Sequence, residues 1–469
     1  MTILEKVADY TLTLQLEKMK PDAVETGRSF FMDTLGCIIA GSQQKPSLIA
    51  FDFCKKMYGE ERKSATVFGS GGVKLNTCGA SFINGISSHF HDYDDMLPTL
   101  SGHPSAAVLP CVLALCEELN KSGKDALEAY IAGVEIVDIM SRGLNSKTLV
   151  HYSKGWHSTQ TIGIFGAAAA AGLLLGLTKK ELITAFSIAA SESCGLQGNF
   201  GTMTKAFHAG RASEKGILVA RLAQSGFTAN PDIMEMDGGY TKATADGFLD
   251  KDWMLERMQT RESAFIDPGI TMKPYPCCKC THNIIDDIWN LMTKYKFKND
   301  DVEKVLVQAQ PLSVACLKYP EAKTMLEGKF SAQYGVALVL VNEKLPGIPH
   351  FDGTEITNQR VLETMKKVQM VQDDSIAGGK FFAGNWETRM IVTLKDGREL
   401  KESVVYARGE AQNPMTQGQV LDKFRECMNI SLFPEKSETV VDMLQNLAKL
   451  SSVRELVGAI ENAARPIAR

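Results

Sequence analysis

Five of the eight histidines in this 469-residue chain fall in two polar segments of an otherwise apolar region. They are His89, His91, His103, His157 and His208. Charged side chains accompany them, namely Asp92, Asp94, Asp95, Lys205 and Arg211. A single histidine on an apolar face is more often a satisfied core residue, but clustered titratable groups favour a functional site. Lysine and arginine can neutralise carboxylates, while histidine moves protons and aspartate orients histidine. The set predicts acid–base chemistry, such as removal of a proton alpha to a carboxylate.

Two of these histidines precede predicted helices. His157 stands before Ser-Thr at the mouth of an alanine-rich helix, and His103 stands before Pro104, which suits a first helical turn. The positive end of a helix disfavours imidazolium and lowers the pKa of a histidine. We therefore expect both rings to be neutral and able to accept a proton near pH 7, with Asp92 orienting one of them. Lys205 is expected to bind a substrate carboxylate.

Metal binding and nucleophilic catalysis are weaker alternatives. His89-x-His91-Asp92 with Asp94 and Asp95 could ligate a transition metal. The run Cys277-Cys-Lys-Cys280-Thr-His282 lacks the two-residue spacing of a zinc knuckle, and no second cysteine pair stands at a suitable distance. We therefore predict no metal. There is no Gly-x-Ser-x-Gly elbow, and a thiol at Cys278 could be reactive or inert.

The elements that must position these groups are mostly helices. Residues 162–177 hold no charge and five consecutive alanines, which predicts a helix buried on all sides that is too short and too rich in glycine to be a good membrane span. Apolar helices are expected at 105–117 and 124–142, and Thr178-Lys-Lys-Glu181 is a capping box that opens another. The first 270 residues show no convincing strand alternation.

The pattern changes near Pro268. Strands are predicted at 302–308, 366–372 and 389–394, and Asp396-Gly397 marks a hairpin. An apolar helix is expected at 329–341, and the tail from Thr416 returns to helices. The predicted fold is mainly α: a large all-helical domain built from both termini, residues 1–268 and 401–469, with a smaller inserted α+β lid domain, residues 269–400.

Composition excludes several kinds of partner. The net charge is −4 and no basic block is present, which argues against nucleic acid. No stretch qualifies as a membrane span, and the N-terminus lacks a signal-peptide core. Eleven cysteines, several in apolar runs, indicate reduced thiols in a cytoplasmic protein.

The chain resembles the MmgE/PrpD family throughout its length. Four stretches carry the resemblance: His91-Asp92-Tyr-Asp94-Asp95 with Gly102-His103-Pro104-Ser105, Gly155-Trp-His157-Ser-Thr with the alanine run, Thr204-Lys205-Ala-Phe-His208-Ala-Gly210-Arg211, and Lys273-Pro-Tyr-Pro276-Cys-Cys278. Each stretch alone is weak, but together they are specific for the family.

The resemblance implies a homodimer without metal or organic cofactor and a site between the two domains that takes a small anionic carboxylate. Carried over by motif, the expected catalytic residues are His103, His157, Lys205 and Asp92, and the expected substrate-binding residues are Lys273, Cys278, His208 and Arg211.

The sequence departs from the decarboxylases of this family at two positions. Animal decarboxylases place a histidine where Cys278 aligns, and Met96 stands where a threonine is usual. Itaconate-forming decarboxylation therefore lacks a candidate proton donor.

The expected activity is that of a cofactor-independent lyase, a hydro-lyase of the 2-methylcitrate dehydratase kind. An iminodisuccinate-like epimerase or a cis-aconitate decarboxylase-like enzyme is the alternative. A non-catalytic organic-acid-binding protein is an alternative of another class, which a turnover assay with a panel of polycarboxylates would distinguish.

Overall fold

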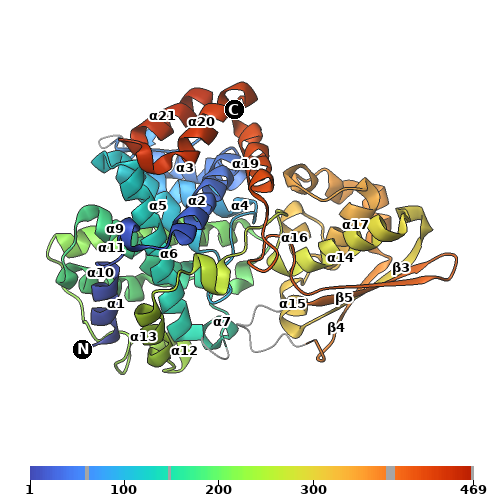
Figure 1. Ribbon diagram of the computed structural model, residues 1–469, viewed down its shortest axis with the longest axis horizontal. Helices are drawn as coiled ribbons and strands as arrows, with labels where there is room; N and C mark the ends of the chain where they lie inside the picture. Colours follow the sequence, from blue (N-terminus) through green and yellow to red (C-terminus); the bar gives the residue numbers. More distant parts are fainter. Residues whose placement is uncertain (59–62, 146–148, 377–385, 466–469) are drawn as a thin grey trace. The chain divides into compact units, whose positions relative to one another are not determined.

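The computed structural model describes residues 1–58, 63–145, 149–376 and 386–465. It divides into two compact units (Figure 1). Unit 1 comprises Met1–Phe90, Asp94–Ile270 and Thr416–Arg469, and unit 2 comprises His91–Tyr93 and Thr271–Met415. The prediction of a mainly α fold with a small α+β part is confirmed. The boundary predicted at residue 400 falls inside the last strand, whose hydrogen bonds to its neighbour keep it in unit 2.

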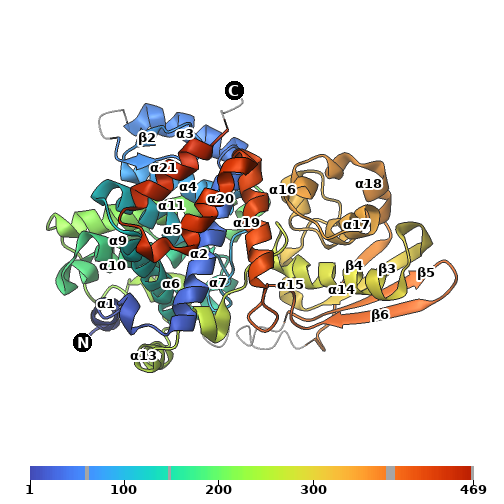
Figure 2. The same ribbon diagram turned by 45° about the horizontal axis from the view of Figure 1, so that its top comes forward.

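Unit 1 is almost wholly helical. Its helices are α1 (Ile3–Thr11), α2 (Pro21–Gly41), α3 (Lys45–Tyr58), α4 (Thr77–Phe90), α5 (Pro104–Leu119), α6 (Gly123–Asn145), α7 (Val150–Ser153), α8 (Ser158–Thr161), α9 (Gly163–Leu175), α10 (Lys179–Glu192), α11 (Met203–Gln224), α12 (Tyr240–Ala245), α13 (Lys251–Thr260), α19 (Gln417–Ser431), α20 (Pro434–Gln445) and α21 (Val453–Ala463). Strands β1 (Ala65–Thr66) and β2 (Lys74–Leu75) form a short antiparallel pair. Helix α19 packs on α2, so both ends of the chain build this unit (Figures 1 and 2).

Helix α9 lies in the core of unit 1, as its composition predicted. Its five alanines, Ala167 to Ala171, are fully buried, and α5, α6 and α11 pack around it. The expectation that no stretch qualifies as a membrane span is wrong by length and composition, because the window Ser158–Leu175 is long and apolar enough to cross a membrane. However, 89% of this window is buried inside the protein, as expected for a core helix. The helix ends at Gly176, which has a positive φ of 71°. The capping box at Thr178 and Glu181 opens α10 as predicted.

Helices α4 and α11 pack antiparallel and unusually close. Ser81 Oγ lies 2.8 Å from Ser213 Oγ, and His89 Nε2 lies 2.8 Å from Lys205 Nζ, so the end of one helix meets the start of the other. At their crossing, a Cβ on Gly85 would be 2.7 Å from Gly210 Cα. Because two glycines let the backbones touch, the polar groups at the helix ends come within hydrogen-bond distance.

Unit 2 contains a four-stranded sheet in the order β4-β3-β5-β6. The strands are β3 (Val302–Ala309), β4 (Val368–Gln372), β5 (Thr388–Leu394) and β6 (Glu399–Val404), and only the β3–β4 pair is parallel. The hairpin predicted at Asp396-Gly397 joins β5 to β6, and Gly397 has a φ of 88°. Helices α14 (Lys279–Tyr295) and α17 (Ala332–Asn342) pack on the sheet (Figure 2). The shorter helices are α15 (Pro311–Cys316), α16 (Met325–Gly328) and α18 (Gln359–Met365).

Candidate active site

A buried group of titratable side chains gathers in unit 1 where α4 ends and α5 and α11 begin. His89 is in the last turn of α4, His103 is the N-cap of α5, and Asp94 lies in the segment between them. Asp94 Oδ2 is 2.8 Å from His89 Nδ1 and 3.2 Å from His103 Nδ1. The rings of His89 and His103 lie 4.3 Å apart between centroids. One carboxylate oxygen therefore contacts two imidazoles.

The protonation states of His89 and Asp94 follow from their surroundings. The pKa of His89 is lowered to about 4, mainly by burial and also by the nearby Lys205, against the opposing effect of Asp94. Burial alone would raise the pKa of Asp94, but the two histidines hold it well below its usual range. Near neutral pH, Asp94 is ionised and His89 is neutral. Asp94 Oδ1 is buried and has no hydrogen-bond partner among the described residues, so it could accept a bond from a water or a ligand.

These states fix the tautomer of His89. An ionised carboxylate only accepts hydrogen bonds, so the proton of the neutral ring must lie on Nδ1, where it donates to Asp94. The other ring nitrogen, Nε2, then carries a lone pair and accepts from the ammonium of Lys205 at 2.8 Å. The result is a continuous buried chain from Asp94 through His89 to Lys205.

A second histidine pair lies beside the first. His157 Nδ1 is 2.8 Å from His208 Nδ1, and the ring of His157 is 5.9 Å from that of His89. Phe200 packs on the edge of this group, 4.9 Å from the His157 ring and 5.6 Å from Lys205 Nζ. Burial is the main cause that lowers the pKa of His208 to about 4 and the pKa of His157 well below its usual range. Two neutral imidazoles in contact through Nδ1 require one donor and one acceptor.

The direction of the His157 pKa agrees with the sequence prediction, but the principal cause differs. Helix α8, which His157 precedes, has only four residues, and burial is the largest influence, followed by the charge of Lys205. Among the described residues, His157 Nε2 makes no hydrogen bond. This nitrogen is therefore suited to exchange a proton with a ligand.

Unit 1 brings together four of the eight predicted site residues: His103, His157, Lys205 and His208. Arg211 lies one helical turn beyond His208, but its guanidinium pairs with Glu214 at 2.5 Å and lies near Phe207 and Phe82. A substrate-binding role for Arg211 stays a prediction. The ion pair joins two residues of α11 and orients Glu214, whose carboxylate also accepts a hydrogen bond from the hydroxyl of Tyr58.

Asp92, Lys273 and Cys278 belong to unit 2. Lys273 Nζ is 2.5 Å from Asp92 Oδ1 and 3.1 Å from the carbonyls of Asp92 and Cys277. The position expected for Asp92, beside the histidines, is occupied in unit 1 by Asp94. Asp92 has a positive φ of 52°, which turns the chain so that neighbouring acids point in different directions. The predicted functional roles of Asp92 and Lys273 are not tested by this geometry.

Cys278 is the N-cap of α14. A hydrogen bond with Cys280, followed by burial, raises the pKa of its thiol well above the usual value. Nucleophilic or acid–base work by a thiolate at this position is therefore disfavoured near neutral pH. Binding of a substrate by Cys278 stays a prediction.

The donors that could hold a metal ion are His89, Asp94 and His103. Their ligand atoms lie within 4.8 Å of one another and all three residues are buried. The set predicted as the metal alternative is not assembled in unit 1, because His91 and Asp92 belong to unit 2. A metal at these donors would have to displace the proton between His89 and Asp94, which competes with the hydrogen-bonded chain.

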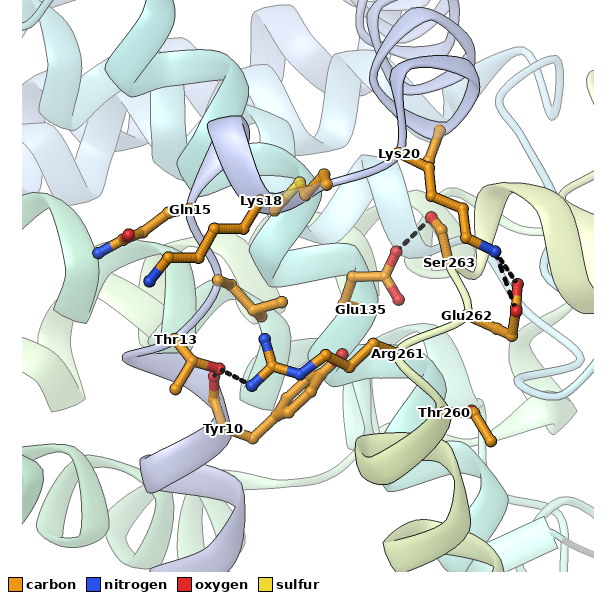
Figure 3. Close-up of a pocket in the computed structure, with 13 residues that line it drawn as sticks. Tyr10, Thr13, Gln15, Lys18, Lys20, Glu135, Thr260, Arg261, Glu262 and Ser263 are labelled. Atoms are coloured by element: carbon orange, nitrogen blue, oxygen red, sulfur yellow. Dashed lines mark hydrogen bonds and ion pairs between the residues drawn. The ribbon is translucent and has the colours of Figure 1, made fainter.

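A separate polar cavity of about 150 Å³ lies near the N-terminal segment of unit 1 (Figure 3). Tyr10, Lys18, Glu135 and Arg261 line it, and it shares no lining residue with the histidine group. Figure 3 shows Glu135 hydrogen-bonded to Ser263, with Oε1 at 2.6 Å from Ser263 Oγ.

A helical scaffold that presents buried neutral imidazoles beside a lysine is suited to an enzyme that transfers protons on an anionic ligand. In a comparison with known protein families, residues 5–251 match the MmgE/PrpD N-terminal domain and residues 275–449 match the MmgE/PrpD C-terminal domain. The chain belongs to the MmgE/PrpD family.

Named relatives are similar over nearly the whole chain. The chain is 25% identical to cis-aconitate decarboxylase of Homo sapiens, over 99% of this chain and 96% of that protein. It is also 25% identical to cis-aconitate decarboxylase of Aspergillus terreus, over 97% of this chain and 95% of that protein. Mitochondrial 2-methylcitrate dehydratase of Yarrowia lipolytica is 22% identical over 87% of this chain and 80% of that protein. These relatives are lyases, which confirms the expectation of a lyase of the MmgE/PrpD type.

Two contacts were not predicted from the sequence: the hydrogen bond between Asp94 and His89, and the hydrogen bond between His89 and Lys205. The sequence pattern predicts Asp92 as the acid that orients a histidine, whereas in the structure Asp94 contacts His89 and His103. Nothing in the spacing of three nearby aspartates says which one faces a histidine, because they lie in an irregular segment.

Proposed function

We propose that this protein is a hydro-lyase that dehydrates a small hydroxylated tricarboxylate of the 2-methylcitrate type. The observation that carries the proposal is a pair of imidazole sets in unit 1, His103 with Asp94 and His157 with His208. Both sets lie close to His89, the partner of Lys205. Dehydration needs two proton transfers, and this arrangement offers two candidates for them.

The reaction would proceed as follows. Lys205 binds a substrate carboxylate and stabilises the negative charge that develops when the adjacent carbon loses its proton. One imidazole, of His103 or His157, takes that proton. The electrons of the broken C–H bond form the carbon–carbon double bond. The other imidazole, which must be protonated in the complex with the anionic substrate, gives its proton to the hydroxyl group, which leaves as water.

Decarboxylation of cis-aconitate is the second candidate. Similarity to cis-aconitate decarboxylases across nearly the whole chain favours it. That reaction breaks a bond between carbon and carboxylate and needs a proton delivered to carbon, which a single acid can supply. The cysteine at position 278, where animal decarboxylases are expected to have histidine, argues against it.

One experiment separates these reactions. Purified protein is incubated in D₂O with 2-methylcitrate or with cis-aconitate, and the products are followed by NMR. The proposal expects 2-methylaconitate from the first substrate and, in the reverse direction, deuterium at the carbon alpha to a carboxylate. Itaconate with released CO₂ from the second substrate would assign the protein as a decarboxylase. Tight binding without turnover across the polycarboxylate panel would favour a binding protein.

The proposal includes a cytoplasmic homodimer that binds neither nucleic acid nor membrane and needs no cofactor. All eleven cysteines are free thiols, in keeping with a reducing compartment. Exposed apolar side chains of α3 and α11, such as Ile49, Phe53 and Phe207, line a groove of about 430 Å³ and would give a dimer an apolar surface to bury. Light scattering that gives a monomer at micromolar concentration would contradict the dimer.

A further inference from the structure

We infer that Asp94 and His89 are positioning residues that act together to hold Lys205 in place for the substrate. The inference rests on the proposed role of Lys205 in binding a carboxylate. Neither residue is assumed to touch the substrate. Their function would be to present one ammonium group at a fixed point beside His103 and His157.

The hydrogen bonds that link Asp94, His89 and Lys205 can run in only one direction. Asp94 Oδ2 accepts from His89 Nδ1 at 2.8 Å, and His89 Nε2 accepts from Lys205 Nζ at 2.8 Å. If the proton of His89 moved to Nε2, this N–H group would point at the N–H groups of Lys205. The lone pair on Nδ1 would then point at a lone pair of the ionised Asp94 carboxylate, so both contacts would be repulsive. The charge of Asp94 therefore selects the tautomer that can hold Lys205.

The backbone fixes the distance between His89 and Lys205. His89 is in the last turn of α4 and Lys205 in the first turn of α11. The close crossing at Gly85 and Gly210 sets the separation of these helices. A long lysine side chain loses considerable rotamer entropy when it is held in one conformation. Because the hydrogen bond to His89 holds Lys205 before the substrate binds, less of this entropy is lost during binding.

Asp94 also contacts a candidate catalytic base. Its Oδ2 atom is also 3.2 Å from His103 Nδ1. A proton on His103 Nδ1 would donate to the same oxygen and leave Nε2 as the basic nitrogen. One buried carboxylate thus orients the residue that binds charge and a residue that moves protons.

The test uses two variants of His89. Each variant keeps only one of its two hydrogen bonds, either the one to Lys205 or the one to Asp94. In His89→Gln, the side-chain oxygen can take the place of Nε2 and still accept from Lys205. In His89→Asn, the amide can take the place of Nδ1 and still donate to Asp94, but it does not reach Lys205. We expect kcat/KM to fall in the order wild type, Gln variant, Asn variant, with about a tenfold or larger loss in the Asn variant, mainly through KM.

A matched control is His350→Gln. His350 is a buried histidine of unit 2 whose Nδ1 accepts from the backbone N–H of Gly347 at 3.0 Å. Its substitution should leave kcat/KM within about twofold of wild type, as expected for a change outside the site. Equal losses in the Gln and Asn variants of His89, or kinetics like wild type in both, would overturn the inference.

A readout that does not depend on turnover is the tautomer of His89 itself. In histidine labelled with ¹⁵N, long-range proton–nitrogen spectra distinguish the Nδ1–H form from the Nε2–H form, and loss of signals in His89→Gln assigns the residue. We expect the Nδ1–H form from pH 5.5 to pH 8 in the wild type, and a shift toward the Nε2–H form in Asp94→Asn. An Nε2–H tautomer in the wild type would refute the inference.

The two proposals can fail separately. If the wild type converts neither 2-methylcitrate nor cis-aconitate, the proposed function is wrong. The tautomer spectra and the affinity for citrate, measured by calorimetry in the same His89 variants, still decide whether Asp94 and His89 position Lys205. Weaker citrate binding in the Asn variant than in the Gln variant would support the inference, and equal binding would count against it.

Discussion

Replacement of Glu135 by glutamine should change how the stability of this protein depends on pH. Glu135 lies on α6 and is only 4% exposed, at the polar cavity of Figure 3. Burial raises the pKa of its carboxyl from 4.5 to about 7, and the charge of Asp138 contributes in the same direction. Its oxygens accept hydrogen bonds from Ser263 and from the N–H of Ala264, which oppose the increase.

The magnitude follows from the two pKa values. Between pH 4.5 and pH 7, the folded chain keeps the proton of Glu135 while the unfolded chain has lost it. The folded state therefore binds more protons, and the free energy of unfolding falls as the pH rises, by about 1.4 kcal/mol per pH unit. Over this interval the loss amounts to about 3 kcal/mol, after which the contribution is constant.

Glutamine has no such proton to lose. Its oxygen can still accept from Ser263 and Ala264, and its amide occupies the place of the protonated oxygen. The difference in stability between Glu135→Gln and the wild type should therefore change by about 3 kcal/mol in favour of the variant between pH 4.5 and pH 8. A constant offset from altered hydrogen bonds does not affect this change.

The assay is urea unfolding followed by circular dichroism at a series of pH values, in which the shift in midpoint is multiplied by the m-value. Glu128→Gln, a half-buried position on the same helix, controls for the introduction of an amide. If the curves of wild type and Glu135→Gln run parallel from pH 4.5 to pH 8, the carboxyl does not keep its proton in the folded state and the reasoning is wrong.

Four further outcomes are expected. His103→Gln and His157→Gln should each lower kcat by at least about a hundredfold without unfolding the protein, as expected for lost acid–base catalysis, and a smaller loss in both would remove them from that role. Lys205→Met should raise KM by about tenfold or more, or abolish turnover, while the melting temperature stays near that of the wild type. An unfolded variant would show that the residue is structural, and unchanged kinetics would show that it lies outside the site. Gly210→Ala should lower the melting temperature, because the new Cβ would lie 2.4 Å from a backbone carbonyl oxygen of α4 and overpacking costs about 1–3 kcal/mol. A variant as stable as the wild type would show that the two helices can move apart. Metal analysis should find well under one equivalent and a chelator should leave turnover intact, whereas stoichiometric metal that restores activity would assign a metal role to the site.

Local patterns in the sequence were sufficient for most of the elements. An uncharged run with five alanines can only be satisfied in an apolar interior, so the burial of α9 follows from composition. The capping box at Thr178 and the hairpin at Asp396-Gly397 are set by hydrogen bonds and backbone angles within a few residues, and both were predicted correctly. The motifs around His103, His157 and Lys205 were likewise sufficient for the family.

The partners of the acidic residues were decided only by the tertiary structure. Asp92, Asp94 and Asp95 are close neighbours in the chain, yet they contact Lys273, His89 and Ser105 respectively. These partners lie between 5 and 181 residues away along the chain. In an irregular segment with a positive φ at Asp92, no periodicity tells which side chain points where. Two glycines that are far apart in the sequence set the separation of α4 and α11, and this separation lets His89 reach Lys205. The sequence does not reveal this contact, because a hydrogen bond depends on differences of tenths of an ångström in distance that residue types do not encode.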